Sequence, residues 1–466
     1  MSEKTKQLKE MLFNQKKNGI DVFTEDELNA CDEFCEGYKE FLGTHKTERE
    51  VAAYVEDVAQ KNGFVKFDEF GGALNAGDKV YYANRGKAII LCVKGKRSIK
   101  DGVRISAAHI DSPRLDLKQC PIYEQDGVGY FKTHYYGGIK KYQWTTIPLS
   151  LHGRICKADG SFVDVKIGEE PGEPKFGITD ILPHLGGEQM QRKANEIVKG
   201  EELNVVIGSR PFKDDDESER IKLNLLSLLY EKYGIVERDF LSAELELVPA
   251  YTVDDIGFDR SMIGGYGHDD RVCSYPALQA ILDIDEAPEY TAITVLTDKE
   301  ETGSDGNTGL NSSYLKYFVE DLARLEGFEG RDVLRNSKCL SADVNAAYDP
   351  TWSTVFEKNN ASFINNGVCV TKFTGARGKS GTSDASAEFC AWVGNLLDEN
   401  GVLWQTGELG KVDGGGGGTV AMYIANMDVD TIDVGVPVLS MHAPYEIVSK
   451  IDVYSAYKAF LTFFTK

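Results

Sequence analysis

The chain has 466 residues, 42% of them hydrophobic, and its 74 acidic against 52 basic side chains give a formal net charge of −22 at pH 7. This length is sufficient for two or three domains with ample cores. So strong a negative charge repels phosphate backbones and anionic lipids, which argues against nucleic-acid and membrane-surface partners. The polar N-terminus, the lack of a bilayer-length apolar run and the nine scattered cysteines predict a cytoplasmic protein with reduced thiols.

Two amphipathic helices are predicted at the start of the chain. Thr24 with Glu27, and Thr47 with Glu50, have the spacing of a capping box, in which a threonine hydroxyl and a glutamate satisfy the free amides of a helix start. Short apolar, β-branched runs follow, which predict strands over 79–82, 88–93 and 103–109.

The middle of the chain has a different character. From about residue 120 to about residue 246, alternating stretches such as 162–167 and turns rich in glycine and proline near 168–177 predict an inserted, β-rich domain. Beyond it, apolar strands alternate with helical segments, as expected for a mixed α/β sheet flanked by helices. Residues 1–119 and 247–466 are therefore predicted to form one catalytic domain around the insertion.

Two adjacent carboxylates, Glu300 and Glu301, come soon after the buried apolar run 292–296. Ligands and catalytic groups of open α/β sheets gather at the carboxyl ends of strands. Neighbouring acids repel one another unless a cation or a shared proton compensates. Taken alone, however, the stretch is more typical of a solvated turn.

Four further positions place an acid or an imidazole where an apolar run stops or a helix begins. They are His109 with Asp111, Asp269, Asp343 and His442. Each signal is weak alone: a satisfied, partly buried histidine is the more frequent outcome for the first, a helix N-cap explains Asp269 about as well, and single polar residues commonly end strands. Together they supply two imidazoles and several carboxylates, a ligand set suited to zinc, cobalt or manganese.

A pair of divalent ions sharing one bridging aspartate would use this whole set of ligands. The ions would also account for the adjacent glutamates, because one carboxylate can bind a metal while the other takes a proton from the attacking water.

The order of the motifs resembles the aspartyl aminopeptidases, dinuclear zinc exopeptidases with a phosphorylase/hydrolase-like α/β fold. The resemblance covers nearly the full chain. The motifs that carry it are His109-x-Asp111-Ser112-Pro113, Tyr136-Gly137-Gly138, His268-Asp269-Asp270, Asp298-x-Glu300-Glu301-x-Gly303-Ser304, Ser341-Ala342-Asp343 and Met441-His442.

The resemblance implies a role for each matching residue. Asp269 would bridge the two ions, Asp111 would orient an imidazole, and Glu300 would be the general base. The remaining implied metal ligands are His109, Glu301, Asp343 and His442. It also implies that residues 120–246 form a dimerisation domain and that the protein assembles as a tetrahedral dodecamer.

Two features bear on the substrate pocket that the resemblance implies. The family has a Pro-His-Leu segment, matched here around His184, and a second histidine four residues later, where this chain has Glu188. Lys372 lies near the family's substrate-binding lysine, with Arg377 and Lys379 as alternatives and a plain surface lysine as the simpler explanation.

The sequence thus predicts a two-metal aminopeptidase that removes the N-terminal residue of peptides, with a preference for Asp or Glu if a lysine lines the pocket. One alternative is a related co-catalytic zinc amidohydrolase, such as a deacylase or a carboxypeptidase. Another is a non-catalytic scaffold that keeps the metal site, although retention of both ligands and base argues against it. The preferred side chain and the resident metal are left open.

Overall fold

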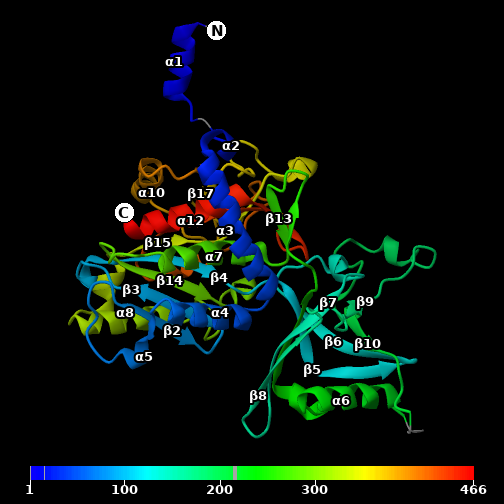
Figure 1. The fold of residues 1–466 in the computed structure, drawn as a ribbon. Coiled ribbons are helices and arrows are strands. Elements are labelled where there is room, and N and C mark those ends of the chain that lie inside the picture. Colours follow the sequence, from blue (N-terminus) through cyan, green and yellow to red (C-terminus); the bar gives the residue numbers. More distant parts are fainter. Residues whose placement is uncertain (1, 15, 214–217) are drawn as a thin grey trace.

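A computed structural model describes residues 2–14, 16–213 and 218–466, and its largest element is a mixed nine-stranded sheet (Figure 1). The strands predicted over 79–82, 88–93 and 103–109 are confirmed. In spatial order the strands are β1 (Val65–Lys66), β2 (Lys79–Asn84), β3 (Ala88–Val93), β14 (Thr291–Thr297), β4 (Val103–His109), β15 (Lys338–Ser341), β19 (Asp430–Gly435), β17 (Val368–Thr371) and β18 (Trp404–Thr406).

Helices cover both faces of this sheet, which is why every residue of its central strands β3, β4 and β14 is buried, without the alternation of a half-exposed strand. In β3, Ile89 and Leu91 belong to one buried cluster, whereas Ile90 and Cys92 belong to another on the opposite face. The helices are α1 (Glu3–Leu12), α2 (Gly19–Val22), α3 (Glu25–Thr44), α4 (Glu48–Lys61), α5 (Phe67–Phe70), α6 (Arg220–Tyr233), α7 (His268–Leu282), α8 (Tyr314–Leu325), α9 (Gly330–Leu334), α10 (Ala387–Glu399), α11 (Ala421–Ala425) and α12 (Lys450–Thr465).

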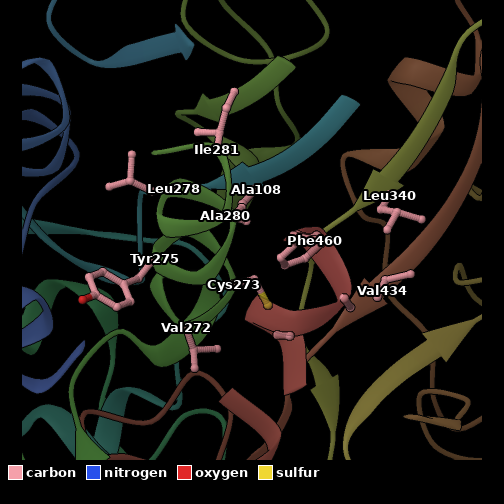
Figure 2. Packing of buried hydrophobic residues seen from close by; sticks show 14 of the residues in the cluster. Ala108, Val272, Cys273, Tyr275, Leu278, Ala280, Ile281, Leu340, Val434 and Phe460 are labelled. Carbon is pink, nitrogen blue, oxygen red and sulfur yellow. The ribbon is translucent and has the colours of Figure 1, made fainter. Parts of the chain in front are cut away.

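Helix α7 lies at the centre of the larger cluster. Its side chains, Leu278 and Cys273 among them, belong to the same buried cluster as Ala108 of β4, Leu340 of β15 and Phe460 of α12 (Figure 2). The two predicted capping boxes are confirmed at the starts of α3 and α4. Among the described residues, no helix combines the length and the apolar character that crossing a bilayer requires.

A separate seven-stranded antiparallel sheet extends from Arg114 to Pro249, a few residues beyond the limits predicted for the insertion at each end (Figure 1). It has its own buried core around Trp144 and Leu247, and α6 packs on its strands. We call it the seven-stranded module. In spatial order its strands are β8 (Phe162–Ile167), β7 (Leu149–Cys156), β11 (Ala243–Pro249), β5 (Arg114–Gln125), β6 (Val128–Tyr136), β10 (Asn204–Gly208) and β9 (Gly177–Ile178).

A five-stranded sheet completes the fold. Strand β13 (Met262–Gly265) of this sheet leads into α7, and strand β20 (Pro437–Leu439) leads to His442. In spatial order the strands are β12 (Asp254–Ile256), β13 (Met262–Gly265), β21 (Glu446–Ser449), β20 (Pro437–Leu439) and β16 (Asn345–Ala346).

Candidate active site

Three adjacent strands of the nine-stranded sheet end at one edge and carry polar side chains there. Strands β14 and β15 both run parallel to β4, with Thr297 paired to His109. His109 is the last residue of β4, Glu300 and Glu301 form a single helical turn just after β14, and Asp343 follows β15 by two residues. The topology thus brings together side chains that are up to 234 residues apart in the sequence.

The five-stranded sheet supplies the other two residues of the cluster. Asp269 is the second residue of α7, and His442 follows β20. Glu446, at the start of β21, accepts hydrogen bonds from the backbone amides of Asp269 at 3.2 Å and of His442 at 2.8 Å. The sequence prediction missed Glu446, whose one signal is an acid directly before the apolar pair Ile447-Val448, four residues beyond His442.

Asp269 lies between the two histidines. Its Oδ1 is 3.1 Å from Nε2 of His109, and its Oδ2 is 3.2 Å from Nε2 of His442. Three groups of potential metal ligands have their ligand atoms within 4.8 Å of one another. They are His109, Glu300 and Glu301; His109, Asp269 and Asp343; and Asp269, Glu301 and His442.

Hydrogen bonds fix the orientation of both imidazoles. His109 Nδ1 lies 3.0 Å from the backbone carbonyl of Asp111, and His442 Nδ1 lies 2.9 Å from that of Gly138. A carbonyl only accepts, so each Nδ1 is the donor and each Nε2 is directed toward the carboxylates. This arrangement is the usual one for histidines that bind a metal through Nε2.

Asp111 lies behind the cluster and is fully buried. Its carboxylate accepts hydrogen bonds from the backbone amides of Glu300 at 3.1 Å and of Glu301 at 3.3 Å. The Tyr136 hydroxyl donates to the same carboxylate at 2.7 Å. Asp111 therefore fixes the backbone of the Glu300–Glu301 turn as well as lying beside His109.

The cluster concentrates negative charge in a buried place. Burial raises the pKa of Glu300 to about 7, and the charges of Asp269 and Asp111 add to this effect against the opposing influence of His109. Burial and neighbouring carboxylates likewise hold the pKa values of Glu301 and Asp343 well above their usual range. A cation bound among these carboxylates would remove the repulsion.

The residues present fit a zinc centre. Oε1 of Glu301 and Oδ2 of Asp343 are buried and have no hydrogen-bond partner among the described residues. A buried polar atom without a partner costs about 1–3 kcal/mol, and more if it is charged. Imidazole nitrogens and carboxylate oxygens are the donors that zinc accepts in catalytic sites.

All seven residues predicted to bind metal or to support catalysis thus lie in one cluster, while the two predicted substrate residues do not join it. Lys372 follows β17 and forms an ion pair with Asp384, its side chain 47% exposed. His184 lies on an exposed loop of the seven-stranded module. Among the described residues, no hydrogen bond or ion pair connects either side chain to the cluster.

Comparison with known proteins shows the family to which the chain belongs. The family model of the aminopeptidase I zinc metalloproteases, M18, matches residues 41–464. A probable M18 family aminopeptidase 1 of Clostridium acetobutylicum is 46% identical and covers 97% of this chain and 99% of its own. One of Thermotoga maritima is 42% identical and covers 98% of this chain and 99% of its own.

Solved structures have the same fold. The crystal structure of the M18 aminopeptidase of Thermotoga maritima superposes with a TM-score of 0.93 at 42% identity, covering 97% of this chain and all of that one. Aminopeptidase I of Clostridium acetobutylicum gives a TM-score of 0.92 at 44% identity, covering 98% of this chain and all of that one. The S. cerevisiae mApe1 dodecamer, at 22% identity, shares the fold with a TM-score of 0.75 over 94% of this chain and 97% of its own.

The fold and the clustered ligands define a zinc metallopeptidase. The chain belongs to the M18 family of aminopeptidase I zinc metalloproteases. The predicted metallo-aminopeptidase activity and α/β fold are confirmed at this level, in preference to a deacylase, a carboxypeptidase or a scaffold.

Proposed function

We propose that this M18 enzyme is a two-metal aminopeptidase in which Asp269 would help to hold both ions. The observation that carries this proposal is that Asp269 belongs to two separate ligand groups and has one carboxylate oxygen near each imidazole. The terminal ligands would be His109, Glu301, Asp343 and His442. When bound, zinc or a similar ion would bind the substrate amine, polarise the scissile carbonyl and increase the acidity of water.

Glu300 would act as the general base. Its carboxylate lies beside the ligand cluster, with Oε2 3.9 Å from Nε2 of His109, where it could take a proton from the attacking water and then give it to the leaving amine. Its side chain is 18% exposed, so it is reachable, whereas that of Glu301 is only 3% exposed. Asp111 holds the amides of both glutamates and so keeps the base in place.

The enzyme would prefer substrates whose N-terminal residue is acidic. Residues 372–384 contain three basic side chains, Lys372, Arg377 and Lys379, against the single acid Asp384. Asp384 contacts both lysines, but one carboxylate cannot balance three basic side chains. The segment therefore keeps a net positive charge that a substrate carboxylate could neutralise.

The seven-stranded module would serve self-association, up to a dodecamer. Four large apolar side chains are exposed on one segment of this module. Clustered exposed apolar side chains often mark a surface that another protein chain covers. They are Ile181, Leu182, Leu185 and Met190.

The decisive variant is Glu300→Gln, which keeps the size of the side chain but removes the base. We expect two bound metal ions per chain, measured by elemental analysis after reconstitution with zinc, and a kcat reduced by about 10²–10⁴-fold. Glu289→Gln is the matched control, because Glu289 is exposed and precedes β14 at its opposite end. Substantial turnover by Glu300→Gln would refute the assignment of the base.

The same assay should use a panel of substrates that differ in the N-terminal residue, together with N-acylated amino acids. Cleavage that requires a free amine supports the aminopeptidase. Faster hydrolysis of Asp and Glu substrates than of Leu and Ala supports the acidic preference, and the reverse order refutes it while leaving the mechanism intact.

A further inference from the structure

The turn formed by residues 136–138 connects the seven-stranded module to the active-site cluster. It begins at the last residue of β6, and each of its three residues meets a different part of the cluster. Tyr136 donates to Oδ2 of Asp111 at 2.7 Å, and the carbonyl of Gly138 accepts from Nδ1 of His442 at 2.9 Å. A Cβ added at Gly137 would lie 3.0 Å from Oε2 of Glu301, and the φ of +76° there also favours glycine.

The Asp111 carboxylate, which accepts the hydrogen bond of the Tyr136 hydroxyl, also accepts hydrogen bonds from backbone amides. Oδ1 of Asp111 accepts from the Glu300 amide and lies 3.3 Å from Nδ1 of His109. Its Oδ2 accepts from the Glu301 amide and from the Tyr136 hydroxyl. The hydroxyl bond is the shortest of these, so removing it would leave Asp111 free to turn away from the glutamate amides.

The ring of Tyr136 is itself held in place by the module. The guanidinium of Arg114 on β5 lies 3.8 Å from the ring centroid. Arg114 is buried and contacts Glu48 of α4 at 3.4 Å, Glu246 of β11 at 3.3 Å and Asp116 at 2.8 Å. A buried cation with three carboxylates around it has little freedom to move, so the tyrosine is fixed from both sides.

We infer that Tyr136 is a positioning residue that acts through Asp111 to set the Glu300–Glu301 turn. The seven-stranded module therefore contributes directly to the shape of the metal centre, in addition to any part in assembly. The inference rests on the proposed function, because it takes the cluster to be the two-metal site.

Tyr136→Phe tests the inference, because it removes only the hydroxyl and keeps the ring against Arg114. Loss of a group that orients metal ligands typically lowers metal affinity or activity by about 10–100-fold. We expect a loss of this size in zinc affinity, measured by competition with a chromogenic chelator, and in kcat, with KM little changed. The Tm and the sedimentation coefficient should match those of the wild type.

Tyr130→Phe is the matched control on the same strand. Tyr130 stacks on Tyr123, and its hydroxyl has no hydrogen bond to any described residue. This variant should bind zinc and turn over substrate as the wild type does.

Asp111→Asn and the double variant show whether Tyr136 acts through Asp111. If it does, adding Tyr136→Phe to Asp111→Asn costs nothing further, whereas a purely structural effect of the tyrosine would add to that of Asp111→Asn. Additive losses, or a Tyr136→Phe enzyme with wild-type zinc affinity and kcat, would overturn the inference. Different results would refute the proposed function itself. The wild type would then bind fewer than two metal ions per chain, or Glu300→Gln would remain active.

Discussion

Glu300 and Glu301 are neighbours in the sequence, but their carboxylates have different surroundings. Oε1 of Glu301 is buried and lies 3.7 Å from Nε2 of His442, whereas Oε2 of Glu300 lies 3.9 Å from Nε2 of His109 on the more exposed side of the turn. Their mutual repulsion was readable in the sequence, and so was the need for a compensating cation. The contact of Glu446 with the Asp269 amide, 177 residues away, was not readable, and neither was that of the Tyr136 hydroxyl with Asp111, because tertiary folding decides which groups meet.

Gly435 offers a test of the ligand geometry at the level of one residue. A Cβ at this position would lie 1.7 Å from the backbone carbonyl oxygen of Asp343. Gly435→Ala should therefore push β19 and Asp343 apart. We expect a loss of stability of about 1–3 kcal/mol, as for other overpacked sites, together with weaker zinc binding.

Thermal unfolding and chelator competition measure these two effects. Gly72→Ala is the control, because an added Cβ there has no neighbour within 4 Å. If Gly435→Ala bound zinc as tightly as the wild type, the position of Asp343 would not matter to the metal site.

At the level of elements, local sequence predicted the strands and helix starts, but their partners depend on tertiary contacts. An apolar run, 434–439, precedes His442 in the sequence. The structure divides it between β19 of the nine-stranded sheet and β20 of the five-stranded sheet. The antiparallel pairing of β3 with β14 likewise has no local signal, because every residue of both strands is buried.

A buried histidine joins α4 to the seven-stranded module. His152 of β7 contacts Glu50 of α4 at 2.8 Å and Glu169 at 3.0 Å. Burial opposes charge on this imidazole, but the two carboxylates raise its pKa above the usual 6.5. Burial also opposes charge on Glu169, yet the His152 hydrogen bond and the Lys46 charge lower the pKa of Glu169 to about 2.

The sign of the pH dependence follows from these shifts. The raised pKa of His152 contributes stability that is complete below about pH 6.5 and is lost as the pH rises through the folded-state value. The lowered pKa of Glu169 contributes stability that is complete above about pH 4.5 and is lost only as the pH falls toward 2. The Tm difference between wild type and His152→Gln should therefore be largest near pH 5–6 and smaller at about pH 8.5.

Differential scanning calorimetry across this range gives the comparison. His134→Gln is the control, because His134 is exposed on β6. Its Tm difference from the wild type should stay constant with pH. A His152→Gln difference that is also constant would mean that folding does not shift the pKa of this imidazole, and a difference that grows toward high pH would mean that the folded protein holds it neutral.

For the whole molecule, the net charge of −22 opposes any assembly of identical copies. The exposed apolar stretch of the module, including Leu185 and Met190, supplies the attraction that would have to overcome it. Salt screens the repulsion, with a Debye length of about 10 Å at 0.1 M, and leaves apolar contacts intact. We therefore expect the assembled fraction, measured by sedimentation velocity at fixed protein and zinc concentrations, to rise from about 0.02 M to about 0.5 M NaCl. Dissociation over the same range would instead mean that ion pairs between copies dominate the interface, and that the apolar stretch has another use.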